Sequence, residues 1–81
     1  MGANECAAVV KQIITEKLGI EPQKLAEDLS FQEDLGVDSL DLVEVFWAVE
    51  KKFKLTIPDE ELEQLRTIGQ LVEYVHDRAA A

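Results

Sequence analysis

Apolar residues recur every three or four positions along most of this chain, which is the spacing of one face of an α-helix. No stretch shows the alternation of apolar and polar residues that is typical of a β-strand. We expect helices over about residues 6–18, 38–53 and 68–79, and a short helix that begins near Pro58. Since 81 residues leave room for one modest core, the sequence predicts an all-α fold. This fold is a small four-helix bundle, with three longer helices, one short helix and a long loop between the first and second helices.

Residues at the expected helix ends favour these boundaries. Asn4 is suited to cap the first helix and Gly19 to end it. Asp38 is suited to open the second helix. The segments 30–33 and 67–70 each have the Ser/Thr-x-x-Glu/Gln pattern of a capping box. They predict a short helical turn at the first site and the start of the last helix at the second.

The helix that begins at Asp38 has apolar residues on two opposite sides. One side is wide enough to face the core and consists of Leu42, Val45, Phe46, Val49 and Phe53. The other side is a stripe of Leu40, Val43 and Trp47, flanked by Asp41, Glu44 and Glu50. A small core cannot surround the helix, so we expect Leu40 and Trp47 to form an exposed docking surface. For Val43, burial under the long loop is the competing interpretation.

The charge of the chain limits the partners it can have. The 17 acidic residues outnumber the 8 Lys and Arg residues, which gives a net charge of −9. This balance disfavours nucleic acid and favours basic protein surfaces as partners. No apolar run approaches the roughly 18–20 residues of a membrane span, so we expect no membrane insertion. With a single cysteine, Cys6, the chain can form neither an internal disulfide nor a cysteine-based metal cluster, and we expect no metal site. The single cysteine also fits a reducing compartment, and we expect a cytoplasmic monomer.

Ser39 lies in the first turn of the same helix, where unpaired backbone N–H groups favour an anionic group. Asp38 can cap the helix itself, which leaves the Ser39 hydroxyl free to point outward. A catalytic serine site is not expected, because the one histidine, His76, is distant in sequence and no Gly-x-Ser-x-Gly motif is present. We expect His76 on the surface of the last helix. A calcium-binding loop is disfavoured, because "EDLGVDSLDLVE" lacks the Asp-x-Asp-x-Asp-Gly spacing.

The same stretch, "EDLGVDSLDLVE", resembles the prosthetic-group site of acyl carrier proteins, whose hallmark is a D-S-L tripeptide that opens the second helix. "SFQEDLG" before it, "FKLTIPDEE" after it and the closing "TIGQLVEYV" resemble the family in order and spacing. The resemblance extends from the first helix to about Val75. It leads us to expect a single acyl-carrier-like domain over residues 1–81.

The resemblance implies a carrier and not an enzyme. In this family a phosphopantetheinyl transferase joins 4′-phosphopantetheine from coenzyme A to the serine, here Ser39 beside Asp38. Acyl groups then travel as thioesters to synthases and transferases with basic docking patches, in fatty-acid or related lipid or polyketide biosynthesis. The implied partner-facing residues are Leu40, Asp41, Val43, Glu44, Trp47, Glu50 and Ile57. The implied acyl-chain contacts are Val45, Phe46, Val49 and Leu71.

Two departures from the family pattern lie in the second helix and just after it. Trp47 stands where the family often has an unbranched residue such as Met, and Lys51, Lys52 and Lys54 stand where an acidic run is common. They fit sequence drift on a solvated face, a specialised carrier with a restricted set of partners, or a core shaped for an unusual acyl group.

Two alternatives to a fatty-acid or polyketide carrier stay open. A peptidyl or aminoacyl carrier would share the mechanism, but Asp38 directly before the serine favours the fatty-acid or polyketide type. A noncovalent acidic helical adaptor would bind a basic partner through Leu40 and Trp47 and would have no need of Ser39.

Overall fold

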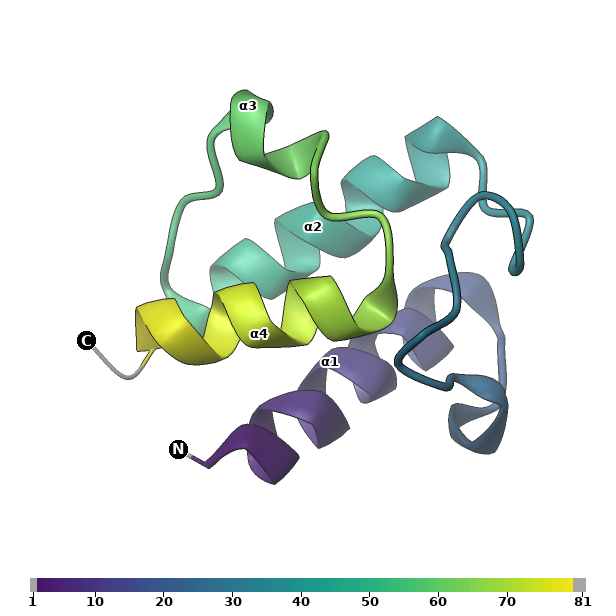
Figure 1. The fold of residues 1–81 in the computed structure, drawn as a ribbon, viewed down its shortest axis with the longest axis horizontal. Coiled ribbons are helices and arrows are strands. Elements are labelled where there is room, and N and C mark those ends of the chain that lie inside the picture. The colour runs from purple at the N-terminus through teal and green to yellow at the C-terminus, as the bar shows by residue number, and fades with distance from the viewer. Residues whose placement is uncertain (1, 80–81) are drawn as a thin grey trace.

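The computed structural model describes residues 2–79, which form four α-helices and one short 3-10 helix. The elements in chain order are α1 (Ala3–Leu18), η1 (Pro22–Lys24), α2 (Ser39–Phe53), α3 (Asp59–Leu62) and α4 (Ile68–Ala79). Helix α1 packs against both α2 and α4, while α3 lies at the rim, within the connection from α2 to α4 (Figure 1). The expected all-α fold, with a long loop between the first and second helices, is confirmed. None of these helices is both long enough and apolar enough to cross a membrane.

The core is formed by one face of each longer helix together with single residues from the connections. The helices contribute Cys6, Val10, Ile13, Ile14, Val45, Phe46, Val49, Ile68, Leu71, Val72 and Val75. The connections contribute Leu25, Phe31, Val37, Ile57 and Leu65. The rings of Phe31 and Phe46 meet edge to face with centroids 6.2 Å apart, so the long loop is packed onto α2. The expected core face of α2 is confirmed: Val45, Phe46 and Val49 are buried, and Leu42 and Phe53 pack against the core.

Two helix ends follow the sequence prediction. Gly19 ends α1 with φ of 71°, a left-handed conformation that favours glycine, and its N–H donates to the Thr15 carbonyl at 2.8 Å. At the start of α4 the capping box is complete. The Gln70 N–H donates to Thr67 Oγ1 at 3.1 Å, and the Thr67 N–H donates to Gln70 Oε1 at 3.1 Å.

One other expectation about helix ends is wrong. Helix α1 begins at Ala3 with Gly2 in the capping position, so Asn4 lies inside the first turn and does not cap it.

The short turn expected at Ser30 does form. The Glu33 N–H donates to Ser30 Oγ at 3.2 Å, which is half of a capping box, and the Asp34 N–H donates to the Ser30 carbonyl at 3.1 Å. The turn spans residues 31–34. Phe31 within it is held in the core, and its N–H donates to the Arg66 carbonyl at 3.0 Å.

Backbone hydrogen bonds attach the middle of the long loop to the start of α4. The Ile68 N–H donates to the Leu29 carbonyl at 3.2 Å, and the Gly69 N–H donates to the Glu27 carbonyl at 2.8 Å. A Cβ at position 69 would lie 2.9 Å from the Glu27 carbonyl oxygen, so the approach depends on glycine. These bonds fix the loop that leads into α2.

Candidate functional site

The first turn of α2 presents a hydroxyl to solvent. Asp38, with extended backbone, is the N-cap, and its Oδ1 accepts a hydrogen bond from the Leu40 N–H at 3.2 Å. Ser39 is exposed, and its Oγ makes only a long hydrogen bond of 3.4 Å to Asp38 Oδ1. Capping is therefore done by Asp38, as the sequence predicted, and the Ser39 hydroxyl is accessible.

The loop before α2 explains why these two residues project from the surface. Gly36 has φ of 64°, which lets the chain turn sharply. Val37 then enters the core, where it is 8% exposed, and its N–H donates to the Phe31 carbonyl at 2.8 Å. Because the chain is fixed at Val37, Asp38 and Ser39 are held at a defined position at the start of the helix.

Ser30 is the other serine of the chain and has a different environment. Its backbone N–H donates to Asp34 Oδ2 at 2.7 Å, and its Oγ accepts from the Glu33 N–H at 3.2 Å. It is half-buried in the turn that these bonds stabilise. Of the two serines, Ser39 is therefore the more exposed.

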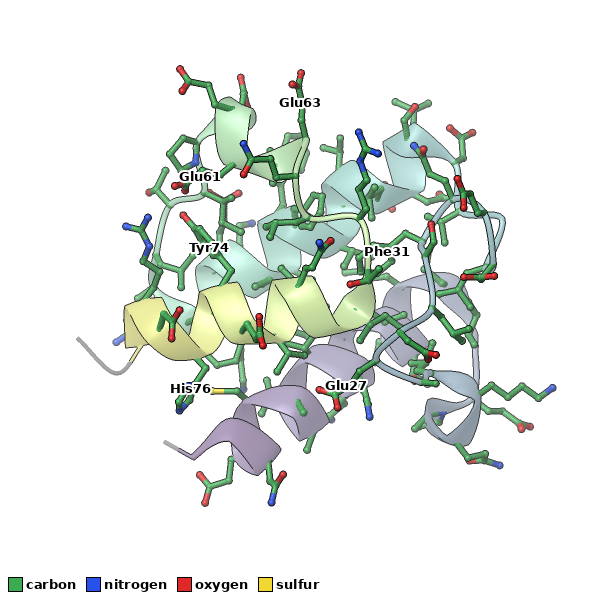
Figure 2. The ribbon with its side chains drawn as sticks, viewed as in Figure 1. Glu27, Phe31, Glu61, Glu63, Tyr74 and His76 are labelled. Atoms are coloured by element: carbon green, nitrogen blue, oxygen red, sulfur yellow. The ribbon has the colours of Figure 1, made fainter. Side chains whose placement is uncertain are left out.

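A groove of about 640 Å³ begins beside Ser39 and separates α2 from the long loop and from the segment around α3. Helix α2 contributes Ser39, Leu42, Val43 and Phe46 to its walls, and the opposite walls include Phe31, Leu62, Glu63, Leu65 and Arg66. Phe31 and Glu63, which come from two different walls, are labelled in Figure 2. The exposed hydroxyl thus stands at the edge of a groove with an apolar aromatic floor.

Comparison with known proteins identifies the family. Residues 8–75 match the family model described as the phosphopantetheine attachment site. The acyl carrier protein of Wolinella succinogenes is 46% identical over 66 residues, which cover 82% of this chain and 87% of that protein. The chain belongs to the acyl carrier protein family.

Two further acyl carrier proteins are similarly related. That of Thermosynechococcus vestitus is 40% identical over 81 residues, the full length of both chains. That of Bdellovibrio bacteriovorus is 46% identical over 72 residues, 89% of this chain and 92% of its own. The resemblance noted in the sequence is confirmed. This acyl carrier protein is a carrier that bears a covalent 4′-phosphopantetheine.

The first turn of α2 in this carrier is chemically suited to such a group. A phosphodiester needs a hydroxyl without steric cover, and Ser39 is exposed. Its negative charge is favoured near the unpaired N–H groups of a helix N-terminus. The groove beside Ser39 offers apolar surface from Leu42 and Phe46. The residues present therefore fit the group.

The four residues expected to contact an acyl chain all belong to the buried core, but only one of them also lines the groove. Phe46 lines the groove of this carrier. Val45, Val49 and Leu71 are each 0% exposed and lie within the packed core. Contact between these three and an acyl chain would require the core to open.

The outward stripe of α2 is exposed in the carrier. Leu40 is 75% exposed, Trp47 62% and Val43 38%, so Val43 is not covered by the long loop. Asp41 and Glu44, on the same helix, are also exposed. Exposed apolar side chains beside acidic ones give this face the composition of a docking surface.

The structure corrects the expected placement of Glu50 and Ile57. Ile57 is 4% exposed and belongs to the core, so its side chain is not on the exposed partner-facing side. Glu50 is half-buried, and its Oε2 accepts a hydrogen bond from the Ile57 N–H at 3.1 Å. The physical reason is that this N–H needs an acceptor once the α2–α3 connection is packed, and Glu50 supplies it.

A cluster that the sequence analysis did not find joins α3 to α4. Glu61 accepts a hydrogen bond from the Tyr74 hydroxyl and pairs with Arg78 at 3.3 Å, and Figure 2 shows Glu61 and Tyr74 pointing toward each other. The Arg78 guanidinium lies 4.9 Å from the centre of the Tyr74 ring. Burial, followed by the hydrogen bond to Glu61, raises the pKa of Tyr74. The four-residue spacing of Tyr74 and Arg78 could have suggested their contact, but nothing in the sequence indicated Glu61.

His76 is half-buried and lines a second groove, of about 860 Å³, between α1 and α4. The expectation of a surface residue is therefore met only in part. This groove does not include Ser39.

Proposed function

We propose that Ser39 is the residue that carries the 4′-phosphopantetheine of this protein. The observation that supports this most directly is the exposed Ser39 hydroxyl at the start of α2, next to an aspartate that caps the helix in its place. The only other serine, Ser30, has its hydroxyl oxygen engaged by the Glu33 N–H. The proposal therefore assigns the modification to the one serine that is free of a structural task.

The attachment itself is the work of a phosphopantetheinyl transferase. The Ser39 hydroxyl loses its proton and its Oγ forms the phosphodiester, while the pyrophosphate bond of coenzyme A breaks and adenosine 3′,5′-bisphosphate leaves. Asp38 has a positioning part in this reaction, because its side chain fixes the first turn of α2 and thereby the direction of the hydroxyl. The first-turn N–H groups of α2 stabilise the phosphate charge. When attached, the group supplies a thiol that carries acyl chains as thioesters.

The carrier presents its cargo to biosynthetic enzymes through α2. The residues in this role are Leu40, Asp41, Val43, Glu44 and Trp47, whose exposure supports it. Glu50 and Ile57 are not assigned this role, because the Glu50 carboxylate accepts a hydrogen bond from the Ile57 N–H and the Ile57 side chain is buried. Phe46, at the floor of the groove, is the first acyl-chain contact.

The partners that we propose follow from the family and from the net charge of −9. The partners are synthases and acyltransferases of fatty-acid or related lipid or polyketide biosynthesis that carry basic patches. The protein acts in the cytoplasm as a monomer, and residues 1–81 form one domain.

Intact-mass measurement tests the assignment of Ser39. The protein is incubated with coenzyme A, magnesium and a promiscuous transferase, alongside Ser39→Ala and the matched control Ser30→Ala. We expect one phosphopantetheine on the parent and on Ser30→Ala, and none on Ser39→Ala. A gain of mass by Ser39→Ala would contradict the assignment. No gain by any of the three, with an active control carrier, would favour the noncovalent adaptor.

A further inference from the structure

The exposed side of α2 carries one line of side chains that is apolar at its start and basic at its end. The line consists of Leu40, Val43, Trp47 and Lys51, which are separated by three or four residues and so follow one another along one side of the helix. All four are exposed. The large indole of Trp47 lies between the apolar part of the line and its basic end.

Charged residues make the two ends of this face opposite in sign. Asp41 and Glu44 lie beside the apolar part of the line and are exposed. Lys51 and Lys52 occupy the last turn of α2, and Lys54 follows as the C-cap. The face therefore has an acidic end, an apolar middle and a basic end.

Among the described residues, the lysines at the basic end have no ionic partner. The one ion pair of this part of the chain joins Arg78 to Glu61 and includes none of these lysines. Glu50, the neighbouring acid in the chain, uses its carboxylate to accept a hydrogen bond from the Ile57 N–H. The ammonium groups of the lysines are therefore available to carboxylates of another molecule.

The helix dipole accounts for only part of this arrangement. It favours basic residues in the last turn of any helix. It does not require that Lys51 share a line with Trp47. It also does not explain Lys54, which adopts φ of 56°, a conformation for which glycine or asparagine is the usual choice. A lysine at this position keeps a third positive charge at the end of the helix.

We propose that α2 docks on a partner protein whose surface has an apolar recess for Trp47 between a basic patch and an acidic patch. The inference deepens the proposed function and rests on its assignment of α2 as the presenting surface. A uniformly basic surface would attract Asp41 and Glu44 but repel Lys51 and Lys54. Two copies of this chain are a poor match for each other, because each carries a net charge of −9.

The experiment begins by capturing a partner in the cells that encode the chain. A photoreactive phenylalanine analogue replaces Leu40, at the acidic end of the face, so that Trp47 and the lysines stay in place. The cross-linked protein is identified by mass spectrometry and then purified. Its affinity for the full-length carrier is measured by isothermal titration calorimetry.

Charge reversal at the basic end then decides the question. We expect Lys51→Glu with Lys54→Glu to weaken binding roughly three- to tenfold, since two exposed attractions become repulsions. The matched control, Lys17→Glu with Lys24→Glu, changes the net charge equally but lies on α1 and η1, and it should change the affinity less than about twofold. Circular dichroism establishes that all variants are folded.

Two outcomes overturn the inference. One is unchanged or tighter binding by the Lys51 and Lys54 double variant, which would indicate a uniformly basic partner. The other is a second copy of the chain as the cross-linked species. Loading of Ser39 is measured on the same variants by intact mass, and it reports on the proposed function separately. Normal loading with no charge dependence refutes the docking inference alone, whereas absent loading refutes the assignment of Ser39.

Discussion

Replacing Tyr74 with phenylalanine tests whether the contact between α3 and α4 depends on the Tyr74 hydroxyl. The substitution removes the donor to Glu61 but keeps the ring that lies 4.9 Å from the Arg78 guanidinium. A hydrogen bond to a charged group contributes about 1.5–3 kcal/mol. Here the Glu61 side chain is 37% exposed and keeps Arg78 as a second partner, so water and that pairing reduce the loss. We expect the free energy of unfolding to fall by about 1 kcal/mol at pH 7.

Urea denaturation followed by circular dichroism measures this loss. For a small domain the slope is about 1 kcal/mol per molar urea, so the midpoint should fall by about 1 M. In a Glu61→Gln background the same substitution should cost roughly half as much, because the acceptor is no longer charged. A midpoint shift below about 0.3 M in the parent background would refute this explanation of how α3 is held.

Tyr74 should also make the stability of the protein depend on pH. Burial and the hydrogen bond to Glu61 raise the pKa of Tyr74 above its ordinary value of 10.0. The folded protein therefore keeps the phenolic proton at a pH where the unfolded chain loses it. This contribution to stability is fully present below pH 10 and is lost as the pH rises through the raised pKa. The difference in stability between the parent and Tyr74→Phe should therefore shrink above pH 10, and a constant difference would contradict the assignment.

Substitutions at three further positions can be measured in the same way. Glu50→Ala leaves the Ile57 N–H without its acceptor and should cost about 1–2 kcal/mol, whereas Glu50→Gln keeps an acceptor oxygen and should cost less than about half of that. Equal costs for the two would contradict the hydrogen bond. Gly69→Ala places a methyl group 2.9 Å from the Glu27 carbonyl oxygen and should destabilise the fold by about 1–2 kcal/mol despite the better helix propensity of alanine. A more stable variant would show that the loop can move away. Trp47→Ala should change the stability by less than about 0.5 kcal/mol, because the side chain is 62% exposed, and a larger loss would give Trp47 a structural role.

The parts of the fold that depend on neighbouring residues in the chain could be predicted from the sequence. Helical periodicity identified the core faces, and Gly19 and the Thr67–Gln70 capping box marked helix ends because both act within a single turn. The same holds for Asp38, whose cap leaves Ser39 exposed. The main site was accessible to sequence reasoning because it is built from consecutive residues.

The parts that depend on contacts between distant segments could not be predicted. Ser30 caps a turn as its local pattern predicts, but the burial of Phe31 in that turn and the bond of its N–H to the Arg66 carbonyl depend on a distant segment. Glu50 has the spacing of a surface residue on α2, yet the α2–α3 connection returns and gives it the Ile57 N–H as a partner. The pairing of Glu61 with Tyr74 depends on where α3 comes to lie, which no local pattern indicates.

Locating the prosthetic group within the native protein tests the central claim most directly. No Lys or Arg lies between Lys24 and Lys51, so trypsin releases residues 25–51 as one peptide that contains both serines. Fragmentation of this peptide, taken from carrier purified from its own cells, shows on which side of Gly36 the added mass lies. We expect the phosphopantetheine on the fragments that contain Ser39. The same mass on fragments that contain Ser30 and end before Gly36 would contradict the account.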